Sequence, residues 1–570
     1  MEDKEAEKEK YLAVKNKNIL IERLLFVAAL VVIILVMMIF IHKKQGMHCD
    51  EVFSYGSSNS TYSNVFYSYW KTDPEKIFFD EYIIDENIFT TIGNVKKYYI
   101  DEKDEKDRIV KEKEDEQTEI WRTREEAIDY MQVTGNEDAF NFSSVYWNQI
   151  SDVHPPLFYL IVNSVSSVFQ NNCSKYLIFG INVVFFVLTA YFMRKILIEI
   201  NKKELGILAV LLYGLSIAGI STVVFLRMYM MLAFFTVLFL YLNIKIINNE
   251  YHIDRGKALA LIATTVGGFL TQYFFCFYAL FVVIVMATIF IKKKEYKEFA
   301  KYIGIFAISA ILGILIFPMS LYHMFFGERG VGFFSNGDYF YRIKTFFELI
   351  LNNFGANNFI GIALLLLATL VVVIIKKKES LPIFSVMTIP VVCYILVISI
   401  IAPFTELRYI MNVLPIASIF VVMMVGSMFD NKSYEVLLVS VMVVGLSGFG
   451  FITQKPTYLF ENYKDYVKIA EENKDLNIVY VGYSFFNHIQ YIEEFMTYEK
   501  SLMIAPEDLH LLETDKELDD KEAFILSIEI TCANNQEILN KVLENTGFEK
   551  YKILKEPTEE NNNKLYKIYR

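Results

Sequence analysis

The residues that could do chemistry lie in short segments beside long apolar runs. An acidic pair, Asp50 and Glu51, follows the first of these runs within MHCDEVFSYGSS. Desolvation beside an apolar surface raises the pKa of a carboxyl group, which suits a general base near neutral pH. Neighbouring residues do not share a helix face, so we expect only one of the two acids to point into a site. The alternative is an acidic pair that ends a helix and stays in water, and the dipeptide alone favours this alternative.

A second polar segment, SDVHPPLFYL, carries Asp152 and His154 before two prolines. Proline biases the preceding residue away from helical geometry, so Pro155 predicts an extended entry into the helix that follows. Such an entry would present Asp152 and His154 as groups that position a substrate. A helix start at the membrane interface, with Asp152 as its N-cap, explains the pattern equally well.

Two isolated arginines, Arg227 in FLRMYM and Arg408 in PFTELRYI, stand at the ends of apolar runs. The guanidinium fork suits a phosphate or diphosphate, and the stem of the side chain can lie along an apolar surface. Each arginine has a tyrosine close by (Tyr229 and Tyr409), and Gln272 occupies a similar turn in TQYFF. Arginines that reach anionic lipid headgroups, together with an aromatic belt, are the alternative explanation.

Composition places these segments in a membrane protein. Of the 570 residues, 54% are hydrophobic and 16% are aromatic, and residues 24–41 and 258–291 contain no charged side chain. A bilayer core of about 30 Å needs about 20 apolar residues per helix, so these runs predict spanning helices. The formal net charge of −11, without a basic stripe, excludes a nucleic-acid-binding protein.

The hydropathy pattern predicts about eleven spanning helices. Lysine and arginine gather in alternate loops, which predicts a multi-pass protein of the cell membrane with a cytoplasmic N-terminus. The chain starts with a charged tail, the first apolar run is too long for a cleavable signal, and no small-residue cleavage site follows it, so we expect that run to be a retained helix. Residues 156–170 are apolar but short, and we interpret them as an interfacial segment on the outer surface. The eleven apolar runs are 24–41, 176–193, 205–226, 228–244, 258–270, 274–291, 302–322, 359–375, 381–402, 409–429 and 434–453.

The chain therefore divides into a mostly α transmembrane domain, residues 1–453, and an extracytoplasmic α/β domain, residues 454–570. The first outer loop, 42–155, includes a mixed-charge stretch at 101–117 that we interpret as a solvated helix or a flexible excursion. A further outer loop is expected at 323–358. In the C-terminal domain, NIVYVGY and AFILSIEI predict buried strands, and DYVKIAEEN and QEILNKVLEN predict helices.

Taken in order, these motifs resemble the bacterial branch of the GT-C glycosyltransferases, which includes the protein O-mannosyltransferases and the aminoarabinose transferase of lipid A. The resemblance spans residues 24–453. The four motifs that carry it are the acidic pair after the first helix, the Asp-x-His-Pro-Pro-Leu sequence from Asp152 to Leu157, the Arg-x-Tyr sequence at 227–229, and Arg408-Tyr409 before a helix that contains Pro415.

The resemblance implies a fold, a reaction and a set of roles. Asp50, with Glu51 beside it, would be catalytic: the general base deprotonates an acceptor hydroxyl while a sugar leaves its polyprenyl-phosphate carrier with inversion. Arg227 and Arg408 would bind the lipid phosphate. Asp152, His154, Tyr229, Gln272 and Tyr409 would position donor and acceptor. The insertion around 71–137 departs from the shorter loops of the superfamily, which leaves the acceptor open.

The superfamily also raises the question of a metal ion. Some of its members need a divalent cation, and His48, Asp50, Glu51, Asp152 and His154 offer oxygen and nitrogen ligands. They show no tight ligand spacing, so we assign no cofactor and keep a divalent cation as an alternative.

Two other classes of function stay open: a secondary transporter and a polytopic receptor. A transporter would need polar or broken helices near the bilayer midplane and symmetry between two halves. The transferase reading predicts that Asp50, His154, Arg227 and Arg408 converge on one outward-facing cavity that opens sideways to lipid.

Overall fold

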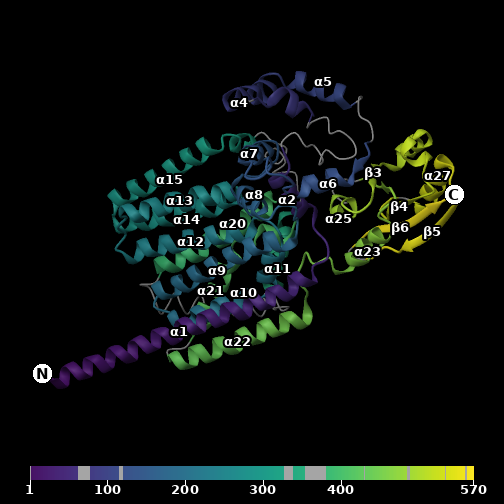
Figure 1. Ribbon diagram of the computed structural model, residues 1–570. Coiled ribbons are helices and arrows are strands. Elements are labelled where there is room, and N and C mark those ends of the chain that lie inside the picture. The colour runs from purple at the N-terminus through teal and green to yellow at the C-terminus, as the bar shows by residue number, and fades with distance from the viewer. Residues whose placement is uncertain are drawn as a thin grey trace. The chain divides into compact units, whose positions relative to one another are not determined.

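The computed structural model is mostly helical and forms two compact units, each described here by itself (Figure 1). Unit 1 comprises residues Met1–His42, Phe179–Leu315 and Gly332–Thr457, and unit 2 comprises Lys43–Ile178, Ile316–Val331 and Tyr458–Arg570. The structure describes residues 2–61, 77–85, 87–114, 120–325, 338–353, 381–428, 431–483, 488–532, 534–558 and 561–570.

Unit 1 is a bundle of apolar helices. Helix α12 packs against α13, α14 and α20, and α10 packs against α21 and α22. Helices α1 and α22 run side by side (Figure 1). The rings of Phe40 on α1 and Phe451 on α22 stack with their centroids 6.1 Å apart. The helices that contribute to this unit are α1 (Glu2–Lys43), α9 (Lys175–Glu199), α10 (Gly206–Gly214), α11 (Ile217–Val224), α12 (Tyr229–Asn248), α13 (Arg255–Thr271), α14 (Phe274–Lys293), α15 (Tyr296–Ile316), α18 (Tyr339–Asn353), α20 (Leu381–Ile401), α21 (Leu414–Gly426) and α22 (Lys432–Thr453).

Seven described helices are long and apolar enough to cross a membrane, or eight if the bent pair α10–α11 forms one span. They match the predicted runs that begin at 24, 176, 228, 274, 302, 381 and 434. Run 258–270 forms the 17-residue α13, and run 409–429 contains only the 13-residue α21. Run 359–375 lies outside the described residues. The chain is thus a multi-pass membrane protein, and the count of about eleven spans stays a prediction.

One predicted helix, over 205–226, is broken in the structure. Helices α10 and α11 meet at 64°. Ser216 caps α11 by accepting a hydrogen bond from the Gly219 backbone N–H at 2.9 Å. A Cβ atom at Gly219 would lie 2.0 Å from the Tyr213 carbonyl oxygen, so the bend needs glycine at this close approach. Hydropathy alone could not reveal the break, because both sides of it are apolar.

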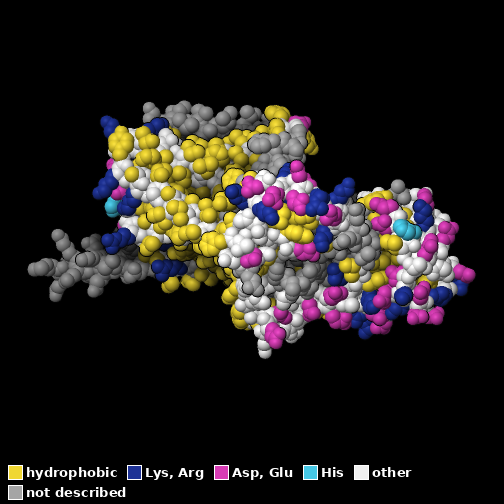
Figure 2. Space-filling view, turned by 90° about the horizontal axis from the view of Figure 1, so that it is seen from above, with side chains coloured by type: hydrophobic (Ala, Val, Ile, Leu, Met, Phe, Trp, Pro, Cys, Tyr) yellow, Lys and Arg dark blue, Asp and Glu magenta, His cyan; other side chains and the backbone are white. Residues whose placement is uncertain are grey.

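The surface of unit 1 is largely apolar, as expected for a protein surrounded by lipid. Figure 2 shows hydrophobic side chains spread over the helices, with lysine and arginine gathered at one end of this surface. Many large aliphatic side chains are exposed, among them Leu35 on α1, Leu315 on α15 and Val444 on α22. An apolar surface of this extent is rare in soluble monomers, whereas in a bilayer it faces acyl chains.

The helices of unit 2 come from the first outer loop and the segment just after it, from one short segment after α15, and from the C-terminal part of the chain. The predicted solvated helix at 101–117 is present as α5, where Arg108 bridges Glu105 and Glu112 at 2.6 and 2.7 Å. The apolar segment 156–170 forms α8, whose 12 residues are too few to span a bilayer. The helices of this unit are α2 (Cys49–Asn59), α4 (Ile88–Lys96), α5 (Lys103–Glu114), α6 (Arg124–Met131), α7 (Phe142–Ile150), α8 (Leu157–Val168), α16 (Ser320–Phe325), α23 (Lys464–Glu472), α25 (Ile492–Phe495), α26 (Lys516–Asp519) and α27 (Asn535–Thr546).

Unit 2 also contains a six-stranded sheet with the order β1-β3-β2-β4-β6-β5. Strand β2 is parallel to β3 and β4, and the remaining pairs are antiparallel. Both strands predicted from the sequence are present and fully buried, as β2 and β4. The strands are β1 (Arg122–Thr123), β2 (Ile478–Val481), β3 (Lys500–Ile504), β4 (Ala523–Glu529), β5 (Lys550–Lys555) and β6 (Asn563–Tyr569).

The sheet joins two parts of the chain that the sequence analysis separated. Strand β1 belongs to the first outer loop, and it pairs with β3 through Arg122 opposite Ser501 and Thr123 opposite Lys500. The Trp121 indole N–H donates to Asp515 at 2.7 Å and supports the same contact. The first outer loop and residues 458–570 therefore share one compact unit, and the boundary at residue 454 stays a prediction.

Candidate functional site

The first turn of α2 gives its two acidic residues different surroundings. His48 is the N-cap residue, and the Glu51 carboxylate accepts a hydrogen bond from the His48 backbone N–H at 2.7 Å. The same carboxylate forms an ion pair with Lys44 at 2.8 Å, and both of these side chains are fully buried. Glu51 thus closes the start of the helix and neutralises a buried cation.

Asp50 keeps part of its side chain exposed. About a fifth of the side chain is accessible to solvent, and one carboxylate oxygen lies 3.6 Å from the His48 Nδ1 atom. Its backbone N–H donates to the same ring nitrogen at 3.2 Å. A carboxylate in the first turn of a helix is stabilised by the helix dipole. Of the two acids, Asp50 is the one whose carboxylate a solute can reach.

Lys44 ties this turn to two other parts of unit 2. Its ammonium donates to the Tyr458 carbonyl, and the Lys175 ammonium donates to the carbonyl of Lys44. The Gln45 N–H donates to the Leu459 carbonyl at 2.9 Å. Burial lowers the pKa of Lys44, and the Glu51 carboxylate opposes that shift. The start of the first outer loop, the start of α9 and the start of the C-terminal segment are thereby joined around one buried cation.

Asp152 and His154 form a pair at the other end of the first outer loop. The His154 Nδ1 atom lies 2.9 Å from an Asp152 carboxylate oxygen, and the histidine ring is nearly buried. With its proton on Nδ1, the ring donates to the carboxylate and carries its lone pair on Nε2. Pro156, and not Asp152, is the N-cap of α8; it is buried and has a helical backbone conformation, and the extended entry stays a prediction.

A second histidine, His323 of α16, lies beside this pair. The sequence analysis did not identify it as a site residue. Its Nε2 atom is 3.1 Å from the Ile150 carbonyl, and it interacts electrostatically with both Asp152 and His154. Burial lowers the pKa of His323 to about 4, so the ring is neutral near neutral pH. In the sequence it opens the predicted outer loop 323–358, where nothing marks it as a neighbour of Asp152.

In unit 1, Arg227 lies buried in the turn between α11 and α12. Asn182 of α9 shapes this turn, because its side-chain amide donates to the carbonyls of Val223 and Phe225 at 3.0 and 2.8 Å. Tyr229 stacks on the Phe225 ring, with centroids 5.6 Å apart. Asn182 therefore holds the turn that contains Arg227. The sequence analysis did not single it out, because it lies inside an apolar run.

Arg408 lies in a short 3₁₀ helix, Leu407–Tyr409, after α20. Its Nε atom is 3.0 Å from a carboxylate oxygen of Glu406, and its guanidinium lies 5.2 Å from the centre of the Tyr409 ring. The Tyr394 hydroxyl donates to the Tyr409 carbonyl at 2.8 Å. Arg408 is therefore held by a carboxylate and an aromatic ring from its own turn.

The turn before α14 meets the turn that contains Tyr409. Phe274, which begins α14, meets the Tyr409 ring edge to face at 5.6 Å. Gln272, two residues before it, is buried, and its side-chain amide oxygen accepts from the Tyr273 backbone N–H at 2.8 Å. The Tyr394 side chain also interacts electrostatically with Tyr229.

The predicted site residues thus fall into two groups. Asp50, Glu51, Asp152 and His154 belong to unit 2, and Arg227, Tyr229, Gln272, Arg408 and Tyr409 belong to unit 1. Their convergence on a single cavity, and the catalytic and binding roles assigned to them, stay predictions.

The ligands suggested for a divalent cation all belong to unit 2, but the described residues do not bring them into one group. The structure pairs Asp152 with His154, whereas His48 and Asp50 are grouped with a residue that the prediction left out, Cys49.

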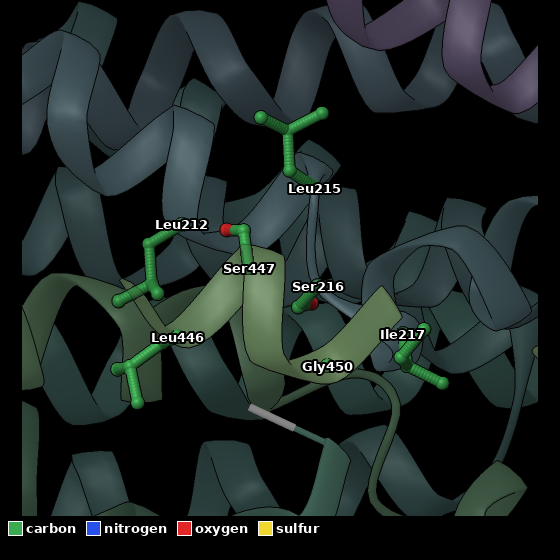
Figure 3. Close-up of a pocket in the computed structure, with 7 residues that line it drawn as sticks. All are labelled: Leu212, Leu215, Ser216, Ile217, Leu446, Ser447 and Gly450. Carbon is green, nitrogen blue, oxygen red and sulfur yellow. The ribbon is translucent and has the colours of Figure 1, made fainter. Parts of the chain in front are cut away.

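A small pocket at the bend between α10 and α11 is a different feature. Figure 3 shows its lining, which combines residues beside the bend with residues of α22. None of these residues is a predicted site residue. Two serine hydroxyls are the polar side chains of the lining, so this pocket is unsuited to a charged phosphate. The lining residues are Leu212, Leu215, Ser216, Ile217, Leu446, Ser447 and Gly450.

Comparison with known proteins identifies the fold. No protein-family model and no curated protein matches the sequence. Among solved structures, ArnT from Cupriavidus metallidurans bound to undecaprenyl phosphate aligns over 95% of this chain and 97% of its own, with a TM-score of 0.51 and 10% identity. The chain has the fold of ArnT. The apo form of the same ArnT aligns over 72% of this chain and 87% of its own, at a TM-score of 0.43 and 11% identity.

The ArnT fold agrees with the mostly helical membrane architecture that the resemblance implied. The alignment reaches beyond the transmembrane region to almost the whole chain. At 10% identity the likeness shows the fold and does not transfer roles to single residues.

Proposed function

We propose that this protein is a GT-C-type glycosyltransferase that moves a sugar from a polyprenyl-phosphate-linked donor to an extracytoplasmic acceptor. The observation that carries the proposal is the ArnT fold over 95% of the chain, found in a structure with undecaprenyl phosphate bound. In this proposal the N-terminus is cytoplasmic and residues 454–570 are extracytoplasmic, as the distribution of lysine and arginine predicts. The cell membrane then supplies the lipid donor, and the outer side supplies the acceptor.

The surroundings of the acidic pair support Asp50 as the general base. The Glu51 carboxylate forms an ion pair with Lys44 and a hydrogen bond at the N-terminus of α2, whereas the Asp50 carboxylate is partly exposed. In the proposed reaction, Asp50 takes the proton of an acceptor hydroxyl as the acceptor oxygen attacks the anomeric carbon of the sugar. The bond from that carbon to the phosphate oxygen breaks, and polyprenyl phosphate leaves. A single displacement of this kind inverts the anomeric configuration.

The remaining predicted residues receive binding and positioning roles. Arg227 and Arg408 are assigned to the lipid phosphate, since both are buried and a guanidinium fork matches phosphate oxygens; the Nε atom of Arg408 already pairs with Glu406. Tyr229, Gln272 and Tyr409, which belong to the neighbouring turns of unit 1, are assigned to the donor.

On the acceptor side, the Asp152–His154 pair offers a histidine ring whose orientation is held by a carboxylate. This is the arrangement that a positioning group needs, because the carboxylate selects one tautomer of the ring.

The test is sugar transfer by the purified full chain, supplied with defined polyprenyl-phosphate sugars and with washed cell envelopes as the acceptor source. Asp50→Asn should lower the transfer rate by about 10²- to 10⁴-fold, the usual contribution of a general base, and leave donor binding unchanged. Asp104→Asn is the matched control, because Asp104 is also an acid in the first turn of a helix of unit 2.

Two results would contradict the proposal. Transfer by Asp50→Asn at the wild-type rate would remove Asp50 from the chemistry. Movement of the intact donor across a vesicle membrane, without cleavage of its sugar–phosphate bond, would replace a transferase by a secondary transporter.

A further inference from the structure

Three different metal-binding side chains meet at the first turn of α2. His48, Cys49 and Asp50 each offer one ligand atom, and these three atoms lie within 4.8 Å of one another. Among the described residues, no other group of three histidine, cysteine or acidic side chains meets this spacing. All three residues are partly exposed, so an ion has access from solvent. The sequence analysis considered His48 and Asp50 and left out Cys49, which supplies the thiol.

The distances fit a tetrahedral ion. The His48 Nδ1 atom is 3.5 Å from the Cys49 sulfur and 3.6 Å from an Asp50 carboxylate oxygen. Zinc bonds of about 2.0 Å to nitrogen and oxygen and about 2.3 Å to sulfur place a tetrahedral N···S pair about 3.5 Å apart. The same geometry places an N···O pair about 3.3 Å apart. These two pairs are within a few tenths of an ångström of the tetrahedral spacing, and the third pair, the Cys49 sulfur and the Asp50 carboxylate oxygen, lies within 4.8 Å.

The local hydrogen bonds prepare the imidazole for coordination. The Asp50 N–H donates to His48 Nδ1, so this nitrogen carries the lone pair and the proton sits on Nε2. A metal ion at Nδ1 would replace that one hydrogen bond. The other half of the capping box, from the His48 N–H to Glu51, would still close the helix.

We propose that His48, Cys49 and Asp50 bind a thiophilic divalent cation of the zinc class. A thiolate, an imidazole and a carboxylate together favour Zn²⁺ or Cd²⁺ over Mg²⁺ or Ca²⁺, which take oxygen ligands. Three protein ligands leave a fourth position for water. The ion would hold the Asp50 carboxylate and keep it from accepting a proton, so it would inhibit transfer. This consequence rests on the proposed function, whereas the binding itself does not.

The binding test uses Cd²⁺ as the probe and the purified full chain. Coordination by a thiolate produces an ultraviolet sulfur-to-cadmium charge-transfer band, and Zn²⁺ should displace Cd²⁺ and remove it. Cys49→Ser should abolish the band. His48→Asn keeps an N-cap side chain but removes the imidazole, and it should weaken affinity at least as much as loss of an outer-shell partner, about 10- to 100-fold.

Cys173→Ser is the matched control in the same unit. Burial raises the pKa of the Cys173 thiol to about 11, so this residue is a poor thiolate near neutral pH and its loss should leave the band intact. The proposal is overturned if Cys49→Ser retains the wild-type band, or if His48→Asn binds Cd²⁺ as tightly as the wild type. Because the readout is binding, a chain that binds Cd²⁺ but transfers no sugar even after the metal has been removed would contradict the proposed function alone.

Discussion

Replacement of Lys44 by methionine should strongly destabilise unit 2. The Lys44 ammonium and the Glu51 carboxylate form a 2.8 Å ion pair, and neither side chain is exposed to solvent. Methionine fills a similar volume but leaves the carboxylate without its cation. Glu51 would keep only the hydrogen bond from the His48 N–H among the bonds described above. The Tyr458 carbonyl would also lose the ammonium donor.

The expected loss of unfolding free energy follows from the burial of the ion pair. Removal of one partner of a buried ion pair costs about 3–5 kcal/mol, because the remaining charge is desolvated without compensation. For a domain of a few hundred residues, each kcal/mol lowers the melting temperature by about 2–4 °C. Lys44→Met should therefore lower the melting temperature of unit 2 by about 6–20 °C.

Tryptophan fluorescence of the purified chain can follow this unit selectively. All three tryptophans, Trp70, Trp121 and Trp147, occur in the part of the sequence that belongs to unit 2. Lys500→Met is the control, because it removes a partly exposed ion pair whose loss costs about 0–1 kcal/mol.

A Lys44→Met protein that melts no lower than the Lys500→Met control would refute the reasoning. The double variant Lys44→Met, Glu51→Leu provides a second check. It removes both buried charges, so it should recover part of the loss.

Three further outcomes are expected. Burial raises the pKa of Glu494 from 4.5 to about 8, so between these pH values the native state binds more protons than the unfolded state. The free energy of unfolding should therefore decrease as pH rises from 4.5 to 8, and Glu494→Gln should make this decrease smaller. Asn182→Leu removes the side-chain amide that donates to the carbonyls of Val223 and Phe225 before α12, and in transfer assays it should raise the KM for the sugar donor more than it changes kcat. Gly56→Ala would place a Cβ atom 1.8 Å from a Tyr130 ring carbon and should cost about 1–3 kcal/mol in thermal unfolding, whereas Gly93→Ala, with no atom within 4 Å, should not destabilise the chain.

Several elements could be predicted from the sequence because their signal is local. The apolar runs read as spanning helices from length and hydropathy alone. Strands β2 and β4 are buried on both faces, so each reads as a continuous apolar run. Strand β1 has no such signal. It consists of Arg122 and Thr123 only, and it exists because Lys500 and Ser501 of a distant strand pair with it.

The chemistry-bearing residue types could also be located from the sequence, because charged groups beside apolar runs are costly and conspicuous. Their surroundings could not. His323 is a neighbour of Asp152, and Asn182 holds the turn before Arg227, through contacts between segments far apart in the chain.

The sequence by itself determined which stretches enter lipid and which polar residues border them, since hydropathy and residue type are properties of short segments. Only the tertiary structure decided that Glu51 is buried against a lysine while the adjacent Asp50 keeps access to solvent. In the sequence, nothing distinguishes the two neighbouring carboxylates from each other. They differ once folding brings Lys44 and a backbone carbonyl of residue 458 to one side of the helix, because burial and charge pairing depend on long-range contacts.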